Sequence, residues 1–310
     1  MRESIKHAWN LLSTTVQNWS NDNAFMHAAA IAFYALFSLA PGFIIVTYIA
    51  GVVYGDEAVR REIAEQMEDI LGRESAVLVE EAIVQSRFEI DDTGIIPTVI
   101  GAAILLVAAT TAFAQLQMSL NEIWSVTPKP SRSGIMVLIY TRLLSLFVVL
   151  ITGILVLLFL IFSTVLTFVM RYIEIYPFLM FLFNTSDFLL TLLFMTLLFG
   201  AVLKVLPDVN LRWGDIWKGA FLTAVLFTIG KSFISFYLGY IGPASVYGAA
   251  GSLVAILFFI YYSLLILLFG AEFTKTYVHS KGLKTIPKRT AVLVRHEIVE
   301  DHESEKLTPE

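Results

Sequence analysis

The chain has 310 residues, of which 57% are hydrophobic and only 15% are charged, and its formal net charge is −5. Soluble domains carry roughly 25% charged residues, so this composition indicates a membrane protein and excludes an ordinary soluble domain. The absence of cysteine excludes disulfides and thiolate metal sites, and the acidic balance is unlike that of a nucleic-acid-binding surface.

Residues 1–23 are predicted to form an amphipathic cytoplasmic arm. Within residues 3–19, apolar side chains recur at helical spacing. These side chains belong to Ile5, Ala8, Trp9, Leu12, Val16 and Trp19. One interpretation is a helix on the inner membrane face, with its tryptophans at the depth of the headgroups. The other is a short helix that packs against the cytoplasmic face of the protein's own bundle.

Residues 24–278 are predicted to form an all-α membrane domain, a bundle of about six transmembrane helices. A bilayer core of about 30 Å needs roughly 20 apolar residues in a helix, and lipid offers no partner for the backbone groups of any other structure. The apolar runs cover residues 25–54, 95–120, 135–170, 188–206, 216–240 and 249–272. Pro41 and Gly42 predict a kink in the first helix, and the third helix is long enough to require a tilt or bend.

Residues 55–93, between the first two spans, are predicted to form a long acidic loop on the outer side. Two periodic apolar stretches, separated at Gly72, predict two amphipathic helices that build a small extramembrane cap. The functional interpretation is a vestibule that attracts cations or a partner. The alternative is a solvated acidic face with no ligand.

The positions of lysine and arginine predict the orientation of the chain in the membrane. These residues gather between spans 2 and 3, between spans 4 and 5, and after span 6. The connection between spans 3 and 4 has only Arg171, and that between spans 5 and 6 has none. This distribution predicts that both termini are cytoplasmic. Residues 279–310 then form a cytoplasmic tail, which we expect to meet anionic headgroups through its lysines and to be largely disordered.

No pattern in the sequence indicates an enzyme. The five histidines have no partners at metal-ligand spacing, and the sequence contains no phosphate-binding glycine loop, nucleophile elbow or zincin motif. We therefore expect no catalytic residue, no metal and no cofactor.

Ionisable residues inside membrane helices are costly and are therefore functional candidates. Lys231 lies about 22 Å along the fifth predicted span, in the outer third of the bilayer, and Asp187 at the outer end of the fourth span is its expected partner. A second group comes from the inner ends of four spans and could form a network that locks or gates the inner side. Its members are Glu122, Arg142, Lys204 and Glu272. Purely structural pairing is the alternative for both groups.

An uncharged, glycine-rich stretch joins the fifth and sixth spans. Such backbone is tolerated at membrane depth only where protein or a water-filled cavity covers it, so it could form an outer gate or a re-entrant turn. A simple tight connection is the alternative, and small-residue clusters elsewhere predict close helix packing. The candidate kink and gate positions are Pro41, Gly42, Gly239, Gly242, Pro243, Gly248 and Gly251.

Several motifs, met in order along the chain, carry a family resemblance. They are Ala32-Phe33-Tyr34, Ser38-Leu39-Ala40-Pro41, Leu120-Asn121-Glu122-Ile123-Trp124, Leu206-Pro207-Asp208-Val209, Trp213, Gly219-Ala220, Gly230-Lys231, Tyr237-Leu238-Gly239, Tyr247-Gly248-Ala249-Ala250-Gly251-Ser252 and Gly270-Ala271-Glu272-Phe273. Through them the chain resembles the YihY/virulence factor BrkB family over about residues 20–275. The resemblance implies a bacterial inner-membrane protein with six spans. Asn121, inside one of these motifs, joins the candidates for transport or gating.

The resemblance also brings a historical ribonuclease BN label, which the sequence does not support. Hydrolysis of RNA needs metal ligands or an acid–base pair in a water-exposed site. The expected function is a transporter or flippase-like carrier of a lipid-linked or other amphiphilic envelope molecule, in which Lys231 holds an anionic headgroup and the inner charges close the inner side. The alternatives are a cation/proton exchanger and a non-catalytic membrane scaffold or accessory subunit of an envelope complex.

The expected partners follow from these expected functions. They are membrane lipids, including anionic headgroups, and either a second copy of the chain or an envelope protein. No nucleic-acid partner is expected.

Overall fold

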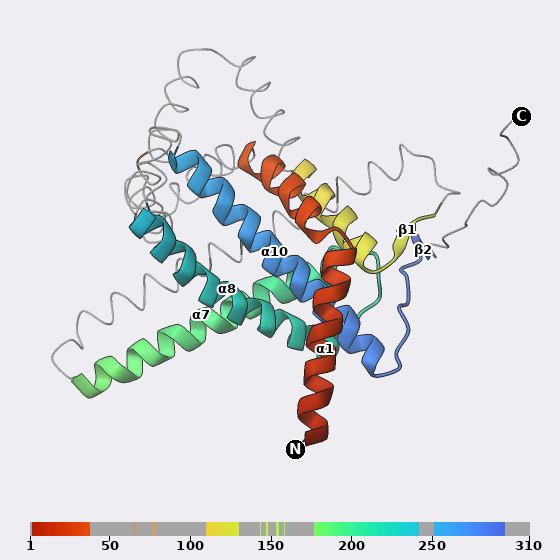
Figure 1. Ribbon diagram of the computed structural model, residues 1–310, viewed down its shortest axis with the longest axis horizontal. Helices are drawn as coiled ribbons and strands as arrows, with labels where there is room; N and C mark the ends of the chain where they lie inside the picture. Colours follow the sequence, from red (N-terminus) through yellow and green to blue (C-terminus); the bar gives the residue numbers. More distant parts are fainter. Residues whose placement is uncertain are drawn as a thin grey trace, which may run out of the picture.

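The computed structural model describes residues 2–37, 110–129, 177–241 and 251–294, together with a few single helical positions between them. This part of the chain is almost entirely helical, as the apolar runs predict. Its long helices are α1 (Arg2–Asn21), α7 (Pro177–Val205), α8 (Trp213–Ile241) and α10 (Gly251–Ser280) (Figure 1). Shorter helices cover residues 24–37 and 110–123, and the two short strands are β1 (Val126–Pro128) and β2 (Ala291–Leu293).

Three long helices coincide with predicted spans but extend beyond them. α7 begins at Pro177 rather than near residue 188, and α10 continues to Ser280 rather than ending near residue 272. Hydropathy detects only the apolar part of a helix, whereas the backbone hydrogen-bond ladder continues into polar turns. By length and composition, the described residues contain two stretches able to cross a bilayer, Phe188–Val205 and Leu253–Ser280.

The amphipathic helix expected at the N-terminus forms as α1, and its last turns pack on the bundle. The chain turns at Asp22 and Asn23 before the helix of residues 24–37 begins. Asn23 has a φ of 52°, a left-handed conformation that asparagine tolerates better than most residues. The ring of Trp19 lies edge-on to Phe269 of α10, with centroids 5.8 Å apart. Of the two interpretations, packing against the bundle therefore holds for the last turns of α1.

Large apolar side chains face outward along the parts of the helices that lack such contacts. Trp9 of α1 is 71% exposed, and Phe233 and Phe236 of α8 are each 70% exposed. Exposure of this size is rare on a soluble monomer. It is the pattern expected of helices whose outer faces meet lipid.

α8 and α10 cross at two glycines that face two threonines. A Cβ atom added to Gly219 would lie 1.8 Å from Thr274 Oγ1, and one added to Gly270 would lie 1.8 Å from Thr223 Oγ1. The crossing is reciprocal, because each helix supplies a glycine and, one turn later, a threonine. Each threonine hydroxyl donates to the carbonyl of the glycine on its own helix, at 2.7 Å, so these buried polar groups are paired. Small residues let helix backbones approach closely in membranes, and this crossing uses that device.

A chain of aromatic rings ties α7 to the same pair of helices. Phe227 of α8 lies between Phe199 of α7, at 5.5 Å, and Phe259 of α10, at 6.1 Å. Near it, Gly230 leaves room for the ring of Tyr262, since a Cβ at Gly230 would lie 2.3 Å from the Tyr262 Cε1. α7, α8 and α10 therefore form one packed unit.

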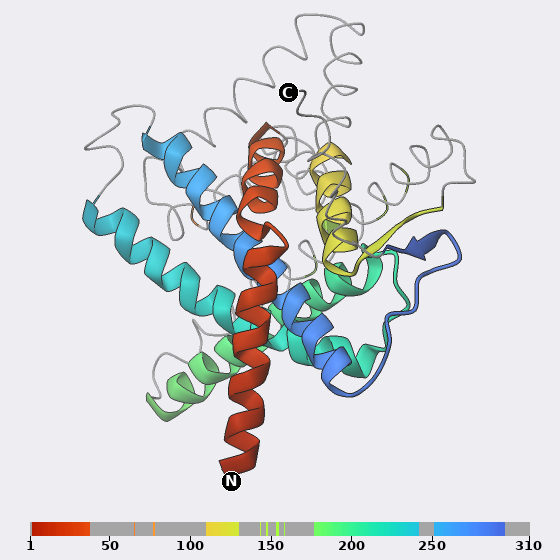
Figure 2. The same cartoon turned by 45° about the vertical axis from the view of Figure 1, so that its right-hand side comes forward.

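The hydrophobic core lies where the α7–α8 turn, the helix of residues 110–123 and α10 meet. Its largest fully buried apolar side chains are Trp124, Leu120, Ile123, Leu206, Ile216 and Leu268. β1 follows the helix of residues 110–123 and pairs antiparallel with β2, so that Val126 lies opposite Leu293. Figure 2 shows the chain running back from the end of α10 to this strand pair.

The first part of the tail, residues 279–294, is therefore ordered, so the prediction of disorder does not apply to these residues. Lys129 N donates to the carbonyl of Thr290 at 3.0 Å, and Val294 N donates to the carbonyl of Ser125 at 2.9 Å. Apolar periodicity could not reveal this order, because the strand has only three residues. Residues 295–310 lie outside the described residues.

The substitution Gly270→Ala should destabilise the protein by about 1–3 kcal/mol, because the added methyl group overlaps Thr223. Combining it with Thr223→Ala removes the closest clashing atom and should restore part of the loss. Thermal unfolding of the purified chain in detergent measures both effects. Gly214→Ala on α8 is the matched control, because its Cβ would meet nothing within 4 Å. Equal unfolding temperatures for Gly270→Ala and Gly214→Ala would contradict the crossing described above.

Candidate functional site

The turn between α7 and α8 buries the carboxylate of Asp208, which is only 5% exposed. Asn121 Nδ2 donates to Asp208 Oδ2 at 3.0 Å, and the backbone N of Asp208 donates to Asn121 Oδ1 at 2.7 Å. Gln117 Nε2, one turn earlier on the same helix, donates to the same carboxylate oxygen at 3.4 Å. A buried carboxylate needs such partners, so the two amides account for its position. We call Gln117, Asn121 and Asp208 the Asp208 cluster.

The tail closes over the Asp208 cluster. The backbone N of Lys288 donates to the carbonyl of Asp208 at 2.8 Å, and Lys288 Nζ donates to the carbonyl of Val205 at 3.1 Å. Burial lowers the pKa of Lys288, and the negative charge of Asp208 opposes that shift. Asn121, a candidate for gating, is in this structure the bridge between the helix of residues 110–123 and the α7–α8 turn.

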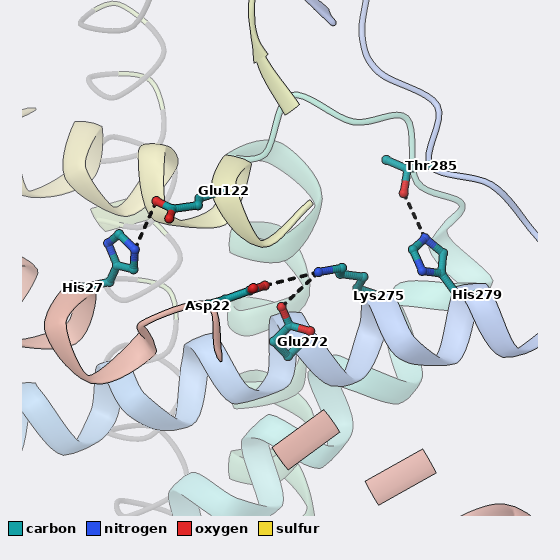
Figure 3. A network of polar contacts seen from close by, with 7 residues as sticks. All are labelled: Asp22, His27, Glu122, Glu272, Lys275, His279 and Thr285. Atoms are coloured by element: carbon teal, nitrogen blue, oxygen red, sulfur yellow. Dashed lines mark hydrogen bonds and ion pairs between the residues drawn. The ribbon is translucent and has the colours of Figure 1, made fainter. Parts of the chain in front are cut away.

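A second cluster joins the end of α1 to α10 (Figure 3). The side chain of Glu272 is fully buried, and its Oε1 lies 3.3 Å from Lys275 Nζ. The same amine lies 3.2 Å from Asp22 Oδ2, in the turn after α1. Lys275 thus bridges two carboxylates. Glu272 Oε2 is buried and has no hydrogen-bond partner among the residues that the structure describes.

His27 and Glu122 form a separate ion pair beside this second cluster (Figure 3). His27 Nε2 lies 3.1 Å from Glu122 Oε2, an ion-pair distance without hydrogen-bond alignment. The histidine side chain is 11% exposed and the glutamate side chain 51% exposed. The pair links the helix of residues 24–37 to that of residues 110–123. It therefore fastens the two short helices to each other at the level of the core.

The predicted inner network of Glu122, Arg142, Lys204 and Glu272 is not assembled as one group in the described part of the chain. Lys204 Nζ donates to the carbonyl of Leu211 and lies 5.9 Å from the centre of the Trp213 ring. Glu122 and Glu272 have the partners described above. Each side chain finds its partner on the nearest turn or helix, and depth along the bilayer does not specify which way a helix face points. Arg142 lies outside the described residues.

Lys231 lies on α8 and is partly exposed, between Ile229 and Phe233, which are 50% and 70% exposed. It has no ion-pair partner among the side chains that the structure describes. Asp187 belongs to α7, but its side chain is outside the described set, so its pairing with Lys231 stays a prediction.

The candidate gate positions are only partly described. Gly239 lies inside α8 and Gly251 is the first residue of α10, so the backbone is helical at both, and the predicted break does not include them. The positions outside the described residues are Pro41, Gly42, Gly242, Pro243 and Gly248. Most of the acidic loop of residues 55–93 and of the third predicted span also lies outside them.

The sequence did not point to five of the residues that build the two clusters and the ion pair, which are Asp22, His27, Gln117, Asp208 and Lys275. Asp208 stood in a family motif, but a carboxylate in a short connection gives no sign of burial. Asp22, His27 and Gln117 are polar residues whose partners lie far away in the sequence. An i, i+3 pairing of Glu272 with Lys275 on one helix face was the available signal.

We expect Asn121→Ala to destabilise the protein by about 1–3 kcal/mol, because it leaves the buried Asp208 carboxylate and backbone N without their main partner. Thermal unfolding in detergent is the measurement. Asn210→Ala is the control, since the Asn210 side chain donates only an exposed bond to the Pro287 carbonyl at 3.2 Å. If both variants unfold at the same temperature, the Asp208 cluster does not hold the turn.

Comparison with known proteins places these motifs in a family. The family model described as Virulence factor BrkB matches residues 15–292. A UPF0761 membrane protein of Chlorobium phaeobacteroides is 28% identical over 265 residues, which cover 83% of this chain and 55% of the relative. One of Chlorobium limicola is 26% identical over 285 residues, covering 90% and 61%. One of Tolumonas auensis is 38% identical over 92 residues, covering 28% and 30%.

The chain thus spans about half the length of the curated relatives that it matches along most of its own length. No solved structure matches it. The match to the family model covers the α7–α8 turn, the α8–α10 crossing and both clusters. The chain therefore belongs to the virulence factor BrkB family of bacterial membrane proteins.

Proposed function

We propose that this chain is a six-span protein of the bacterial inner membrane, with both termini in the cytoplasm, that carries a lipid-linked or other amphiphilic envelope molecule. The observation that supports it most is Lys231, a cation on an apolar helix with no ion-pair partner among the described residues. An unpaired charge at membrane depth is expensive. An anionic headgroup would neutralise this charge, and the exposed apolar side chains on either side suit the acyl chains of the same lipid.

The neighbours of Lys231 fix its position on α8. Gly230 packs directly on the Tyr262 ring of α10, which leaves no space there for a larger side chain unless the ring moves. Ile234, one turn later, is 4% exposed and lies in the packed interior. Lys231 is therefore held beside the α8–α10 contact rather than on a freely turning helix.

In this proposal the two clusters close the inner end of the bundle. The bridge of Lys275 between Asp22 and Glu272 joins α1 to α10, and the Asp208 cluster joins the helix of residues 110–123 to the α7–α8 turn. Opening the inner side requires these polar contacts to break or exchange partners.

A cation/proton exchanger is the second candidate, and Glu272 favours it. Its side chain is fully buried, and one carboxylate oxygen has no hydrogen-bond partner among the described residues. Buried carboxyl groups within membrane domains are the usual sites of proton relays. In this function Glu272 takes up the proton, and Lys275 and Asp22 respond to the change of charge.

A non-catalytic scaffold or accessory subunit of an envelope complex is the remaining alternative. Its supporting feature is the exposed apolar face of α1, formed by Trp9, Leu12 and Val16. This face would lie on inner-leaflet headgroups or on a partner, either a second copy or an envelope protein. In each proposal the protein is not an enzyme and uses no cofactor, and its principal partners are membrane lipids.

The absence of cysteine makes the topology directly testable. Single substitutions Glu65→Cys, at an exposed helical position in the acidic loop, and Lys284→Cys, at an exposed position in the tail, are made in the full chain. A membrane-impermeant maleimide should label the Glu65→Cys variant in intact spheroplasts and the Lys284→Cys variant only after lysis. Labelling of both in intact spheroplasts would contradict the proposed orientation.

Transport is tested in proteoliposomes with fluorescent phosphatidylglycerol, whose transfer between leaflets is followed by dithionite quenching. Lys231→Ala should lower the initial rate by about tenfold, the effect of losing roughly 1.4 kcal/mol of headgroup contact. Lys231→Arg, which keeps the charge, should retain most of the rate. Lys284→Ala in the exposed tail is the control for loss of one charge.

A pH dye trapped in the same vesicles separates the candidates. If Lys231→Ala and Glu272→Ala both transfer lipid at the wild-type rate, the roles proposed for the carrier are wrong. Proton flux without lipid transfer, abolished by Glu272→Gln, would favour the exchanger instead. If the wild-type chain shows neither lipid transfer nor proton flux, the scaffold function is the remaining candidate.

A further inference from the structure

A groove of about 430 Å³ lies between α7 and α8. Its walls are apolar except at one end. They consist of Leu189, Leu192, Leu193, Thr196, Trp217, Lys218 and Phe221. The Thr196 hydroxyl is already used, because it donates to the carbonyl of Leu192 at 2.7 Å. The hydroxyl has thus already donated its proton, the other lining residues apart from Lys218 are apolar or aromatic, and the groove suits a hydrocarbon chain.

The charge at the end of the groove is not neutralised by a carboxylate. Lys218 Nζ and Lys281 Nζ lie 4.5 and 4.3 Å from the centre of the same Tyr277 ring. Lys281 is also 2.6 Å from Asp215 Oδ1, and that hydrogen bond raises the pKa of the lysine. Lys218 has no acidic partner in the part of the chain that the structure describes. Lys218, a residue of the groove wall, thus has a positive charge without a carboxylate partner there, and its amine lies over Tyr277.

We propose that this groove binds an anionic phospholipid, with one acyl chain between α7 and α8 and the phosphate at Lys218. The volume lies within the range of small-ligand sites, and the surroundings of a membrane protein supply this ligand. Trp217, 38% exposed beside Lys218, is the kind of side chain that membrane proteins place at headgroup depth. The site is independent of Lys231 and does not require that the chain transport anything.

Charge complementarity selects the anionic lipid over a zwitterionic one. A lysine near a membrane surface contributes roughly 1 kcal/mol of attraction to anionic headgroups, which corresponds to a preference of about fivefold. The apolar wall contributes equally to both lipids, since their acyl chains can be the same. Substitutions can therefore separate the binding of the acyl chain from the preference for the headgroup.

The test is a titration of the purified full chain in detergent with phosphatidylglycerol or phosphatidylcholine of identical chains, read by native mass spectrometry. The wild-type chain should bind the first about fivefold more tightly. Lys218→Gln should abolish this preference while leaving the affinity for phosphatidylcholine unchanged. Leu193→Trp, which fills the groove, should weaken binding of both lipids.

Two matched variants control for general effects. Leu197→Trp adds the same ring on the same helix, one turn from Leu193, at a residue 42% exposed but outside the groove. Lys284→Gln removes one charge from the exposed tail. Both should bind like the wild type. The proposal is overturned if Leu193→Trp binds lipid as well as Leu197→Trp, or if the preference survives Lys218→Gln or is lost in Lys284→Gln.

Discussion

The reciprocal contact between Gly219 and Thr274, and between Gly270 and Thr223, is the constraint on which the rest of the described bundle depends. It sets how close α8 and α10 can come, because neither glycine position has room for even a methyl group. That separation in turn lets Phe227 bridge Phe199 and Phe259. In a bilayer, where water is absent, such packing has to supply what the hydrophobic effect supplies in a soluble core.

The polar clusters hold the connections between the helices, which the tight crossing itself does not hold. Helices that pack through small residues leave few contacts to hold the connections between them. At one end of the bundle, Asp208 is held by amides of the helix of residues 110–123, and Lys275 holds Asp22 and Glu272 together. Buried charges are weak evidence for stability, but once a partner is removed the remaining charge is costly. The clusters therefore determine the placement of the connecting segments more than they raise the free energy of unfolding.

The sequence was sufficient for the helical class, for the approximate course of α7, α8 and α10, and for the amphipathic nature of α1. Each of these depends on local composition and periodicity, which can be recognised in a short stretch of sequence. The partners of Glu122, Lys204 and Glu272 were not readable, because they depend on how neighbouring helices rotate about their axes. The strand pair near Val126 was also hidden, since three residues are too few for a periodic signal. The sequence does contain a signal for the α8–α10 crossing, because Gly219 and Gly270 are each followed by threonine four residues later.

The ladder of phenylalanine rings has a mechanical consequence. Because Phe227 packs against both Phe199 and Phe259, α7, α8 and α10 hold one another in place as one packed unit. Its attachments to the rest of the described chain include the bonds from Asp208 to Asn121 and from Lys275 to Asp22. These polar attachments can exchange their partners for water, whereas the ring contacts cannot.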